Sequence, residues 1–193
     1  MIDLPKMNDR LKQIFSTRHK KRINNDKLKS AAVLLPLFNK SCELHILFIK
    51  RSSSVFYHKG QISFPGGQIQ DTDVSLKDTA LRESWEEIGL SPEDAEIIGE
   101  LDDTPTRTSH FLISPFVAFI PYPYTFTPSP DEIDEIFEVP LASLLDRSSY
   151  RRRRVTDEGD SILTNTYRYN ELIIWGATAR ILKQLLDLIK NGN

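Results

Sequence analysis

The segment SLKDTALRESWEEIGL, from Ser75 to Leu90, constrains the fold of this chain more than any other stretch. It consists mainly of good helix formers, and Gly89 is placed to end a helix. Leu76, Ala80 and Ile88 recur near one face of that helix, which we expect to be buried. The remaining positions are strongly acidic, so the predicted helix must combine an apolar face with a concentration of like charge.

Three carboxylates of this helix, those of Glu83, Glu86 and Glu87, stand at positions i, i+3 and i+4. A helix brings such side chains to one face, with their Cβ atoms about 5 to 6 Å apart. Each close pair is mutually repulsive, and burial increases the repulsion. A hard divalent cation bound through oxygen converts that repulsion into attraction, so the spacing fits Mg²⁺ or Mn²⁺. A solvated charged face partnered by Arg82 or Lys77 is the alternative.

The residues before this helix predict strands and a tight turn. AAVLLPLF from Ala31 and ELHILFIKR from Glu43 are short apolar runs that indicate a hairpin. A third short run, ISF, ends in Pro65, Gly66 and Gly67, where the backbone can approach a ligand closely. The order of strand, glycine turn and acidic helix is what a metal-dependent phosphate site needs.

The rest of the chain predicts a mixed sheet flanked by helices, an α/β fold. EIIGEL, FLISPFVAFI and EIFEVPL indicate further strands, followed by a helical turn over 141–145 and a C-terminal amphipathic helix that packs on the sheet. Residues 1–28 predict an amphipathic helix and a solvated basic connector, as an appendage to a core domain over 29–193.

Composition excludes several classes of protein. The chain has 193 residues and a net charge of −2, so no overall basic field favours nucleic acid as a partner. It contains neither an apolar run of about 18 residues nor a secretory signal, so we expect a cytoplasmic protein without a membrane partner. Cys42 is the one cysteine, which excludes an internal disulfide, and its apolar surroundings predict a small buried hydrophobe. Neither pattern nor composition sets the oligomeric state.

The turn and helix together resemble the Nudix hydrolase family, whose box this sequence matches from Gly67 through REsWEE to Gly89 and Leu90. Asp73 occupies the first acidic position, with eight residues between it and Arg82, and Ser84 stands where the box has an apolar residue. These departures resemble the coenzyme A pyrophosphatase-like branch of the family.

That branch carries a second signature upstream, an Arg-Ser pair followed by Gly and then FPGG. The sequence KRSSSVFYHKGQISFPGG, from Lys50 to Gly67, is similar to it. Phe56 and Tyr57 stand where many members have an arginine. LDDTPTRTSHFLISPFV and IIWGATARILKQLL also resemble the branch, so the resemblance spans roughly residues 31–186.

The resemblance implies a Nudix-type α/β/α sandwich in which the acidic helix carries the metal ligands. Glu83 and Glu87 are then the first candidates for metal binding and catalysis, and Glu86 follows. Arg82 is expected to orient these carboxylates through its planar, permanently charged fork. Among the residues upstream of the helix, a phosphate contact is expected from Arg51, and close approach of substrate at Gly66 and Gly67.

The implied substrate is coenzyme A or one of its thioesters, a small nucleotide-like molecule cleaved with Mg²⁺ or Mn²⁺ to adenosine 3′,5′-bisphosphate and 4′-phosphopantetheine or its acyl derivative. Glu86, Glu132 and Glu135 are candidates for the base that accepts the proton of the attacking water. His58 and Lys59 lie where they could face phosphate. The run Arg151 to Arg154 reads as a solvated loop, with contact to the 3′-phosphate as the alternative.

Two other functions fit the same residues. One is a Nudix pyrophosphatase acting on ADP-ribose, NADH, dinucleoside polyphosphates or nucleoside triphosphates. The other is an inactive Nudix-fold module that binds nucleotide or RNA through the Arg151 to Arg154 run. The three helix glutamates weigh against the module, because a protein that does not bind a cation has no need to crowd them.

Overall fold

The computed structural model describes residues 4–52, 60–157 and 160–191. The helices within these ranges are α1 (Leu4–Thr17), α2 (Leu76–Ile88), α3 (Leu141–Leu145) and α4 (Gly176–Asn191), with short 3-10 turns η1 (Pro92–Asp94) and η2 (Arg147–Ser149). The strands are β1 (Lys29–Lys40), β2 (Glu43–Arg51), β3 (Ile62–Ser63), β4 (Gly66–Gln68), β5 (Glu96–Glu100), β6 (Thr104–Pro105), β7 (Phe111–Phe119), β8 (Ile133–Pro140), β9 (Tyr150–Asp157), β10 (Asp160–Tyr169) and β11 (Leu172–Ile174).

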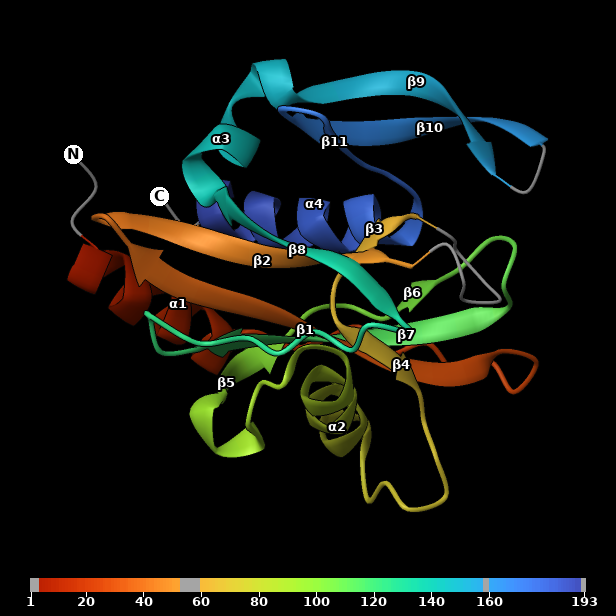
Figure 1. Ribbon diagram of the computed structural model, residues 1–193, viewed down its shortest axis with the longest axis horizontal. Coiled ribbons are helices and arrows are strands. Elements are labelled where there is room, and N and C mark those ends of the chain that lie inside the picture. The colour runs from red at the N-terminus through yellow and green to blue at the C-terminus, as the bar shows by residue number, and fades with distance from the viewer. Residues whose placement is uncertain (1–3, 53–59, 158–159, 192–193) are drawn as a thin grey trace.

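Strand β1 is the centre of the larger sheet, which has the order β3-β2-β1-β7-β5 (Figure 1). β1 runs parallel to β7 and antiparallel to β2 and β4. β8 adds to β2 and β6 adds to β7, both antiparallel. The sheet is therefore mixed, as the sequence predicts.

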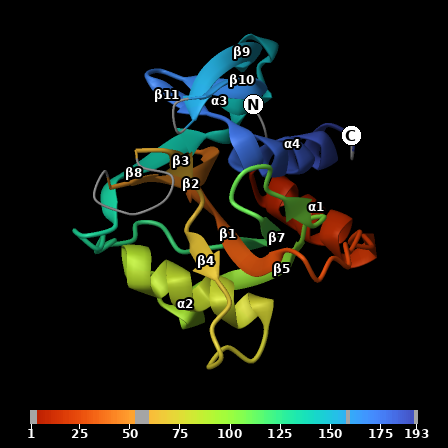
Figure 2. The same ribbon diagram turned by 90° about the vertical axis from the view of Figure 1, so that its right-hand side faces the viewer.

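Helices cover both faces of this sheet, because β1 is apolar on both of its sides. Alternate residues of a strand point to opposite faces. Leu34 lies in a buried cluster with Ile88 of α2, whereas Leu35 and Leu37 lie in a second cluster with Leu182 of α4. Figure 2 shows α2 below the sheet and α1 and α4 above it. The predicted α/β sandwich, with a mixed sheet and an N-terminal helix, is confirmed.

A second, three-stranded sheet has the order β11-β10-β9, and the sequence patterns did not predict it. The run Arg151 to Arg154 belongs to strand β9 and pairs with β10, Arg153 lying opposite Thr164. The prediction of a loop here is therefore wrong, although these arginines are exposed as expected. Four adjacent charged residues show no alternation of apolar and polar side chains, so the hydropathy pattern does not predict a strand. The strand forms nonetheless, because the backbone hydrogen bonds of a hairpin do not require apolar side chains.

Helix α1 contributes to the main core, which corrects the expectation of an appendage. Leu11 is fully buried and Phe15 nearly so, in the same cluster as Leu35 and Leu182. The helical spacing of its apolar residues gives α1 one continuous face, and that face packs on the sheet beside α4.

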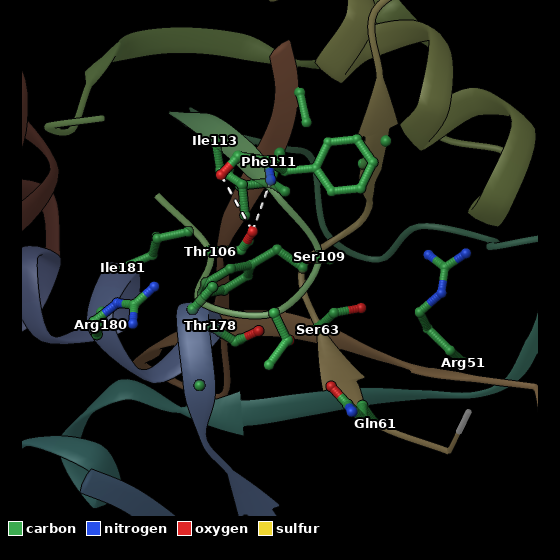
Figure 3. A pocket seen from close by; sticks show the side chains of 18 of the residues that line it. Arg51, Gln61, Ser63, Thr106, Ser109, Phe111, Ile113, Thr178, Arg180 and Ile181 are labelled. Carbon is green, nitrogen blue, oxygen red and sulfur yellow. Dashed lines mark hydrogen bonds between the residues drawn. The ribbon is translucent and has the colours of Figure 1, made fainter. Parts of the chain in front are cut away.

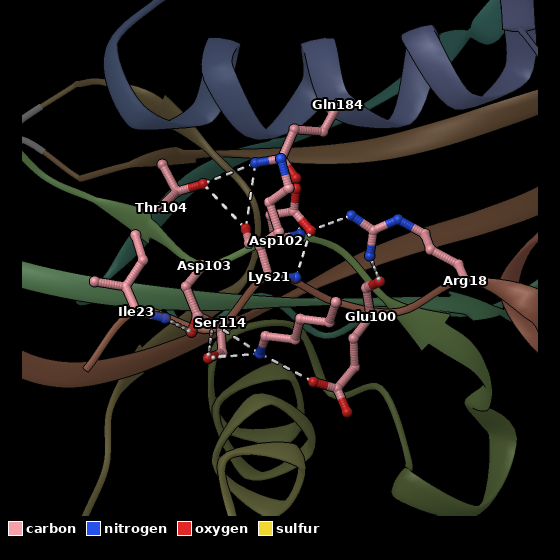
Figure 4. Close-up of polar contacts among 10 residues, drawn as sticks. Arg18, Lys21, Ile23, Glu100, Asp102, Asp103, Thr104, Ser114 and Gln184 are labelled. Atoms are coloured by element: carbon pink, nitrogen blue, oxygen red, sulfur yellow. Dashed lines mark hydrogen bonds and ion pairs between the residues drawn. The ribbon is translucent and has the colours of Figure 1, made fainter.

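The connector after α1 is anchored rather than solvated along its first half (Figure 4). Lys20 Nζ lies 2.7 Å from Asp103 Oδ1 and 2.9 Å from Glu100 Oε2. The guanidinium of Arg18 pairs with Asp102, and its Nη1 donates to the Glu100 carbonyl at 2.7 Å. Arg18 and Lys20, predicted to face water, instead find acidic partners at the end of β5 and just beyond it, whereas Lys21 and Arg22 are exposed as predicted.

Cys42 is exposed, so the prediction of a buried hydrophobe is wrong. It lies in the turn between β1 and β2, where Ser41 and Cys42 adopt φ angles of 50° and 60°. A hairpin turn of two such left-handed residues points its side chains away from the core. Among the described helices, none has the length and apolar character needed to cross a membrane.

Replacing Leu11 with Ala tests whether α1 is integral to the fold. The substitution removes a fully buried side chain, and we expect the free energy of unfolding to fall by about 3 kcal/mol. Val74→Ala is the control, since Val74 is 93% exposed and should change stability by less than about 0.5 kcal/mol. Both are measured by urea unfolding. Equal stability of the two variants would show that residues 1–28 are an appendage and do not belong to the core.

Candidate active site

Helix α2 begins and ends as its sequence predicts, and this places its acidic residues against β4. The Ser75 hydroxyl caps the first turn by accepting from the Asp78 N–H. Gly89 adopts a left-handed φ of 69° and ends the helix, its N–H donating to the Trp85 carbonyl at 2.9 Å. Ala80 and Ile88 are fully buried, and Glu83 and Glu87 lie on the adjoining part of the helix surface, which contacts the glycine turn.

Glu87 is the most deeply buried of the three helix carboxylates, with 1% of its side chain exposed. The backbone N–H of Gly66 donates to its Oε2 at 2.8 Å, and Arg51 Nη1 donates to its Oε1 at 2.8 Å. Burial raises the pKa of Glu87 to about 7, against the opposing effects of the Arg51 charge and the Gly66 hydrogen bond. Repulsion from Glu83 adds to the increase.

Two glycines allow close packing at this turn, Gly66 against strand β1 and Gly67 against the Glu83 carboxylate. A Cβ on Gly66 would lie 2.2 Å from the Ala32 carbonyl oxygen, and its φ of 150° is one that only glycine adopts readily. A Cβ on Gly67 would lie 2.4 Å from the carboxyl group of Glu83. Gly66 therefore lets β4 lie close to β1, and Gly67 lets the acidic helix approach β4 more closely than any larger residue would allow.

Glu83 is partly buried, with 14% of its side chain exposed. Arg82 Nη1 lies 2.9 Å from Glu83 Oε1. Burial raises the pKa of Glu83, and the charges of Glu86 and Glu132 raise it further, while Arg82 opposes them. Four carboxylates thus influence one another within a small region, and their negative charge is only partly compensated.

Arg82 holds this region together through a bidentate ion pair with Asp73. Its Nε lies 2.8 Å from Asp73 Oδ1 and its Nη2 lies 3.0 Å from Oδ2. Arg82 Nη1 also donates to Glu86 Oε2 at 2.8 Å, although the Glu86 side chain is 49% exposed. The hydrogen bonds from Arg82 hold the pKa of Asp73 far below its usual value.

The donor chemistry of Glu83 and Glu87 suits a divalent cation. No three carboxylate, imidazole or thiol side chains within the described ranges converge on a single ready-made ligand position. Mg²⁺, however, keeps several waters and is commonly bound by one or two carboxylates together with substrate phosphates. Each Glu87 oxygen accepts one hydrogen bond from the protein and retains a second lone pair. The residues therefore fit such an ion.

A cavity of about 540 Å³ opens beside the glycine turn (Figure 3). Its acidic end is lined by Arg51, Gly66, Gly67, Glu83 and Glu132. Its other end is formed by the loop between β6 and β7, the first turn of α4 and strand β10; the residues contributed there include Thr106, Arg107, Thr108, Ser109, Ile162, Thr164, Trp175, Gly176, Ala177, Thr178 and Arg180.

The predicted site residues occupy different positions relative to this cavity. Glu83, Arg51 and both glycines line it, whereas Glu87, Glu86 and Arg82 are absent from its lining. Of the candidate bases, Glu132 lines it and Glu135 does not; Glu135 lies in β8, exposed and opposite Lys50. The remaining candidates from the preceding loop, His58, Lys59, Phe56 and Tyr57, fall outside the described residues.

Sequence reasoning missed the second wall of the cavity. The sequence predicts only that the C-terminal helix packs on the sheet, yet residues between Trp175 and Arg180, at its start, also line the cavity together with Arg107. The available signal was the pair of polar stretches TPTRTSH and GATAR, each of which interrupts an apolar pattern next to a strand or helix. Nothing in their spacing indicates that they meet.

The mixed sheet, the glycine turn and the acidic helix define a class of α/β domain organised around α2. Residues 27–158 match the NUDIX domain. The chain belongs to the Nudix hydrolase family.

Two bacterial relatives, both described as the uncharacterized Nudix hydrolase NudL, extend this similarity over most of the chain. The protein from Escherichia coli O7:K1 is 35% identical over 166 residues, covering 85% of each chain. The protein from Photorhabdus laumondii is 36% identical over 167 residues, covering 86% of this chain and 88% of the relative.

Solved structures share the fold at lower sequence identity. A MutT/nudix family protein from Enterococcus faecalis aligns with a TM-score of 0.57 and 15% identity, covering 98% of this chain and 75% of its own. A C. elegans Ap4A hydrolase complex aligns with a TM-score of 0.51 and 18% identity, covering 60% of this chain and 82% of its own.

The Asp73–Arg82 pair should stabilise the protein in a pH-dependent way. Asp73→Asn removes a buried charge and leaves the partly buried Arg82 guanidinium without its main partner, so we expect the free energy of unfolding at pH 7 to fall by about 3 kcal/mol. Because the folded-state pKa of Asp73 is depressed, its contribution is complete above the usual value of 3.8 and is lost as the pH falls below it.

Urea unfolding of wild type and Asp73→Asn between pH 7 and pH 3 measures both effects. The difference between the two curves should shrink toward the acidic end of this range. Asp71→Asn is the matched control, since Asp71 is exposed and should change little. A difference that stays constant with pH would contradict the assigned role of the Asp73 charge.

Proposed function

We propose that this chain is a coenzyme A diphosphatase. It would hydrolyse the pyrophosphate bond of coenzyme A or its thioesters, releasing adenosine 3′,5′-bisphosphate and 4′-phosphopantetheine or its acyl derivative. Membership of the Nudix family supports the reaction class. The Arg-Ser, Gly, FPGG signature supports the substrate, because it resembles the coenzyme A pyrophosphatase-like branch and includes residues that line the cavity, Arg51, Gly66 and Gly67.

The observation that carries the proposal is the single cavity that joins an acidic end to a cationic end. Glu83 and Glu132 line the acidic end with Arg51, and Arg107 and Arg180 line the other. A pyrophosphate ester is anionic and resists attack by water, so its cleavage requires neutralised charge and an activated nucleophile. A substrate with two separate anionic groups matches this distribution of charge.

Glu83 and Glu87 would hold Mg²⁺ or Mn²⁺, with Glu86 as a further ligand. When bound there, a divalent ion supplies charge neutralisation to the diphosphate and lowers the pKa of water. Arg82 acts as a positioning residue, because its fork binds Asp73, Glu83 and Glu86 together. Arg51 fixes the Glu87 carboxylate and presents its charge to the cavity.

Glu132 is the base that this geometry favours. A base must come within hydrogen-bond reach of the attacking water, directly or through one further water. Glu132 lines the cavity near enough to Glu83 for its charge to raise the pKa of that residue. We propose that the Glu132 carboxylate accepts the proton as water attacks phosphorus. The exposed Glu135 has no such access.

A substrate panel tests the proposed function. Purified protein with Mg²⁺ or Mn²⁺ is incubated separately with coenzyme A, acetyl-coenzyme A, ADP-ribose, NADH and a dinucleoside tetraphosphate, and products are identified by mass. We expect adenosine 3′,5′-bisphosphate from coenzyme A. Preferential cleavage of another compound would replace the proposed substrate with one of the alternative pyrophosphates, and no metal-dependent product from any would favour the inactive binding module.

The substitution Glu83→Gln should reduce turnover without preventing the protein from folding. Glu83→Gln keeps the size of the side chain but removes its charge, and we expect kcat to fall by roughly 100-fold or more. Glu93→Gln, in the exposed turn η1, is the matched control and should retain wild-type turnover. Circular dichroism confirms that both variants fold. Unchanged turnover in a folded Glu83→Gln protein would refute the role of Glu83.

A further inference from the structure

Two arginines at the end of the cavity away from Glu83 have no acidic partner among the residues that the structure describes. Arg107 and Arg180 both line the cavity, and neither forms an ion pair within the described part of the chain. Arg180 donates from Nη2 to the Pro105 carbonyl, a neutral acceptor. This differs from Arg51 and Arg82, whose charges are matched by carboxylates.

The two positive charges act on each other. Burial lowers the pKa of Arg180, and the charge of Arg107 lowers it further. Guanidinium groups remain protonated in proteins, so this repulsion is a cost that the folded protein carries in the absence of an anion. A dianion between the two groups would turn the cost into a favourable interaction.

Unsatisfied hydroxyls line the same space. The Oγ atoms of Ser63 and Ser109 are buried and have no hydrogen-bond partner within the described ranges of the chain. Figure 3 shows Ser63 and Ser109 near Thr178, with Arg180 on the other side of Thr178. The first turn of α4 also lines the cavity, and the first N–H groups of a helix have no partner within it. Buried hydroxyls without partners are uncommon, so their gathering here indicates a ligand with several oxygen acceptors.

We propose that this end of the cavity, formed by Arg107, Arg180, Ser63, Ser109 and the start of α4, binds a phosphate monoester, the 3′-phosphate of coenzyme A. This assignment rests on the proposed function. Coenzyme A carries its negative charge in two places, the diphosphate and the 3′-phosphate, and its pantetheine arm is neutral. With the diphosphate beside Glu83, the 3′-phosphate is the group left to meet the unpaired arginines. The site would then distinguish coenzyme A from nucleotides that lack this phosphate.

The arginines of β9 are the rival position for the same phosphate. Arg153 lies opposite Thr164, which lines the cavity. None of the side chains from Arg151 to Arg154, however, belongs to the cavity lining, and all four are exposed. Arg107 is exposed as well, but it lines the cavity together with Arg180, which is partly buried. Because the charge of Arg180 is less screened by water and salt than the four exposed charges of β9, this end of the cavity is the stronger site.

Binding of the two adenine nucleotides tests the inference without requiring turnover. Isothermal titration calorimetry measures the affinities of adenosine 3′,5′-bisphosphate and of 5′-AMP, which differ only in the 3′-phosphate. We expect wild type to prefer the bisphosphate by roughly 10- to 100-fold, since a charge-assisted pair with a phosphate is worth about that factor. Arg107→Ala and Arg180→Gln should each reduce the preference toward one. Arg152→Ala removes an exposed arginine outside the cavity and should preserve it.

Three results would overturn the inference: equal binding of both nucleotides by wild type, no binding of either, or a preference that survives Arg107→Ala but disappears in Arg153→Ala. Circular dichroism establishes that each variant folds.

Cleavage of coenzyme A and 3′-dephospho-coenzyme A separates this inference from the proposed function. Faster cleavage of coenzyme A by wild type, with the difference abolished by Arg107→Ala, supports both. Equal kcat/KM for the two compounds keeps the diphosphatase and refutes the phosphate site. Cleavage of neither compound refutes the proposed function and with it the assignment to coenzyme A, whereas the nucleotide preference measured by calorimetry still reports whether a phosphate site exists.

Discussion

Burial of the Glu83 and Glu87 carboxylates against the Gly-Gly turn of β4 is the constraint on which the site depends. Carboxylates are costly to remove from water unless charge or hydrogen bonds compensate them. Here Arg51, Arg82 and the Gly66 N–H supply part of that compensation. Burial raises the pKa of both glutamates, and repulsion from neighbouring carboxylates adds to the increase. Glu83 lines a cavity where a cation and a phosphate ester can supply further compensation.

The scaffold keeps these groups in place from both sides of the sheet. Strand β1 pairs with β4 and packs on α2 through one face, while its other face packs on α1 and α4. The start of α4 then returns to the cavity and forms its cationic end with the loop between β6 and β7. The two ends are thus contributed by segments on opposite sides of the sheet, and β1 fixes the distance between them.

Local sequence patterns predict the acidic helix and the glycine turn. Most features that the sequence does not predict depend on contacts between residues far apart in the chain. The capping residues and apolar spacing of α2 predict its bounds, and the Gly66-Gly67 turn predicts a close approach. The strand that contains Arg151 to Arg154 could not be found from charge or hydropathy, because it is exposed and stabilised by pairing with β10. The anchoring of Lys20 by Asp103 and the meeting of Arg107 with Arg180 join residues more than 70 positions apart, which no local pattern encodes.

The most direct test of the account is a titration of the intact protein with Mn²⁺. Electron paramagnetic resonance detects binding as a loss of the signal of the free ion. The account predicts that wild type binds Mn²⁺ and that Gly67→Ala, whose added methyl would occupy the position of the Glu83 carboxyl, binds it much more weakly while remaining folded. Equal Mn²⁺ affinity in the two proteins would show that the crowded carboxylates of α2 do not hold the cation, and would contradict the central claim.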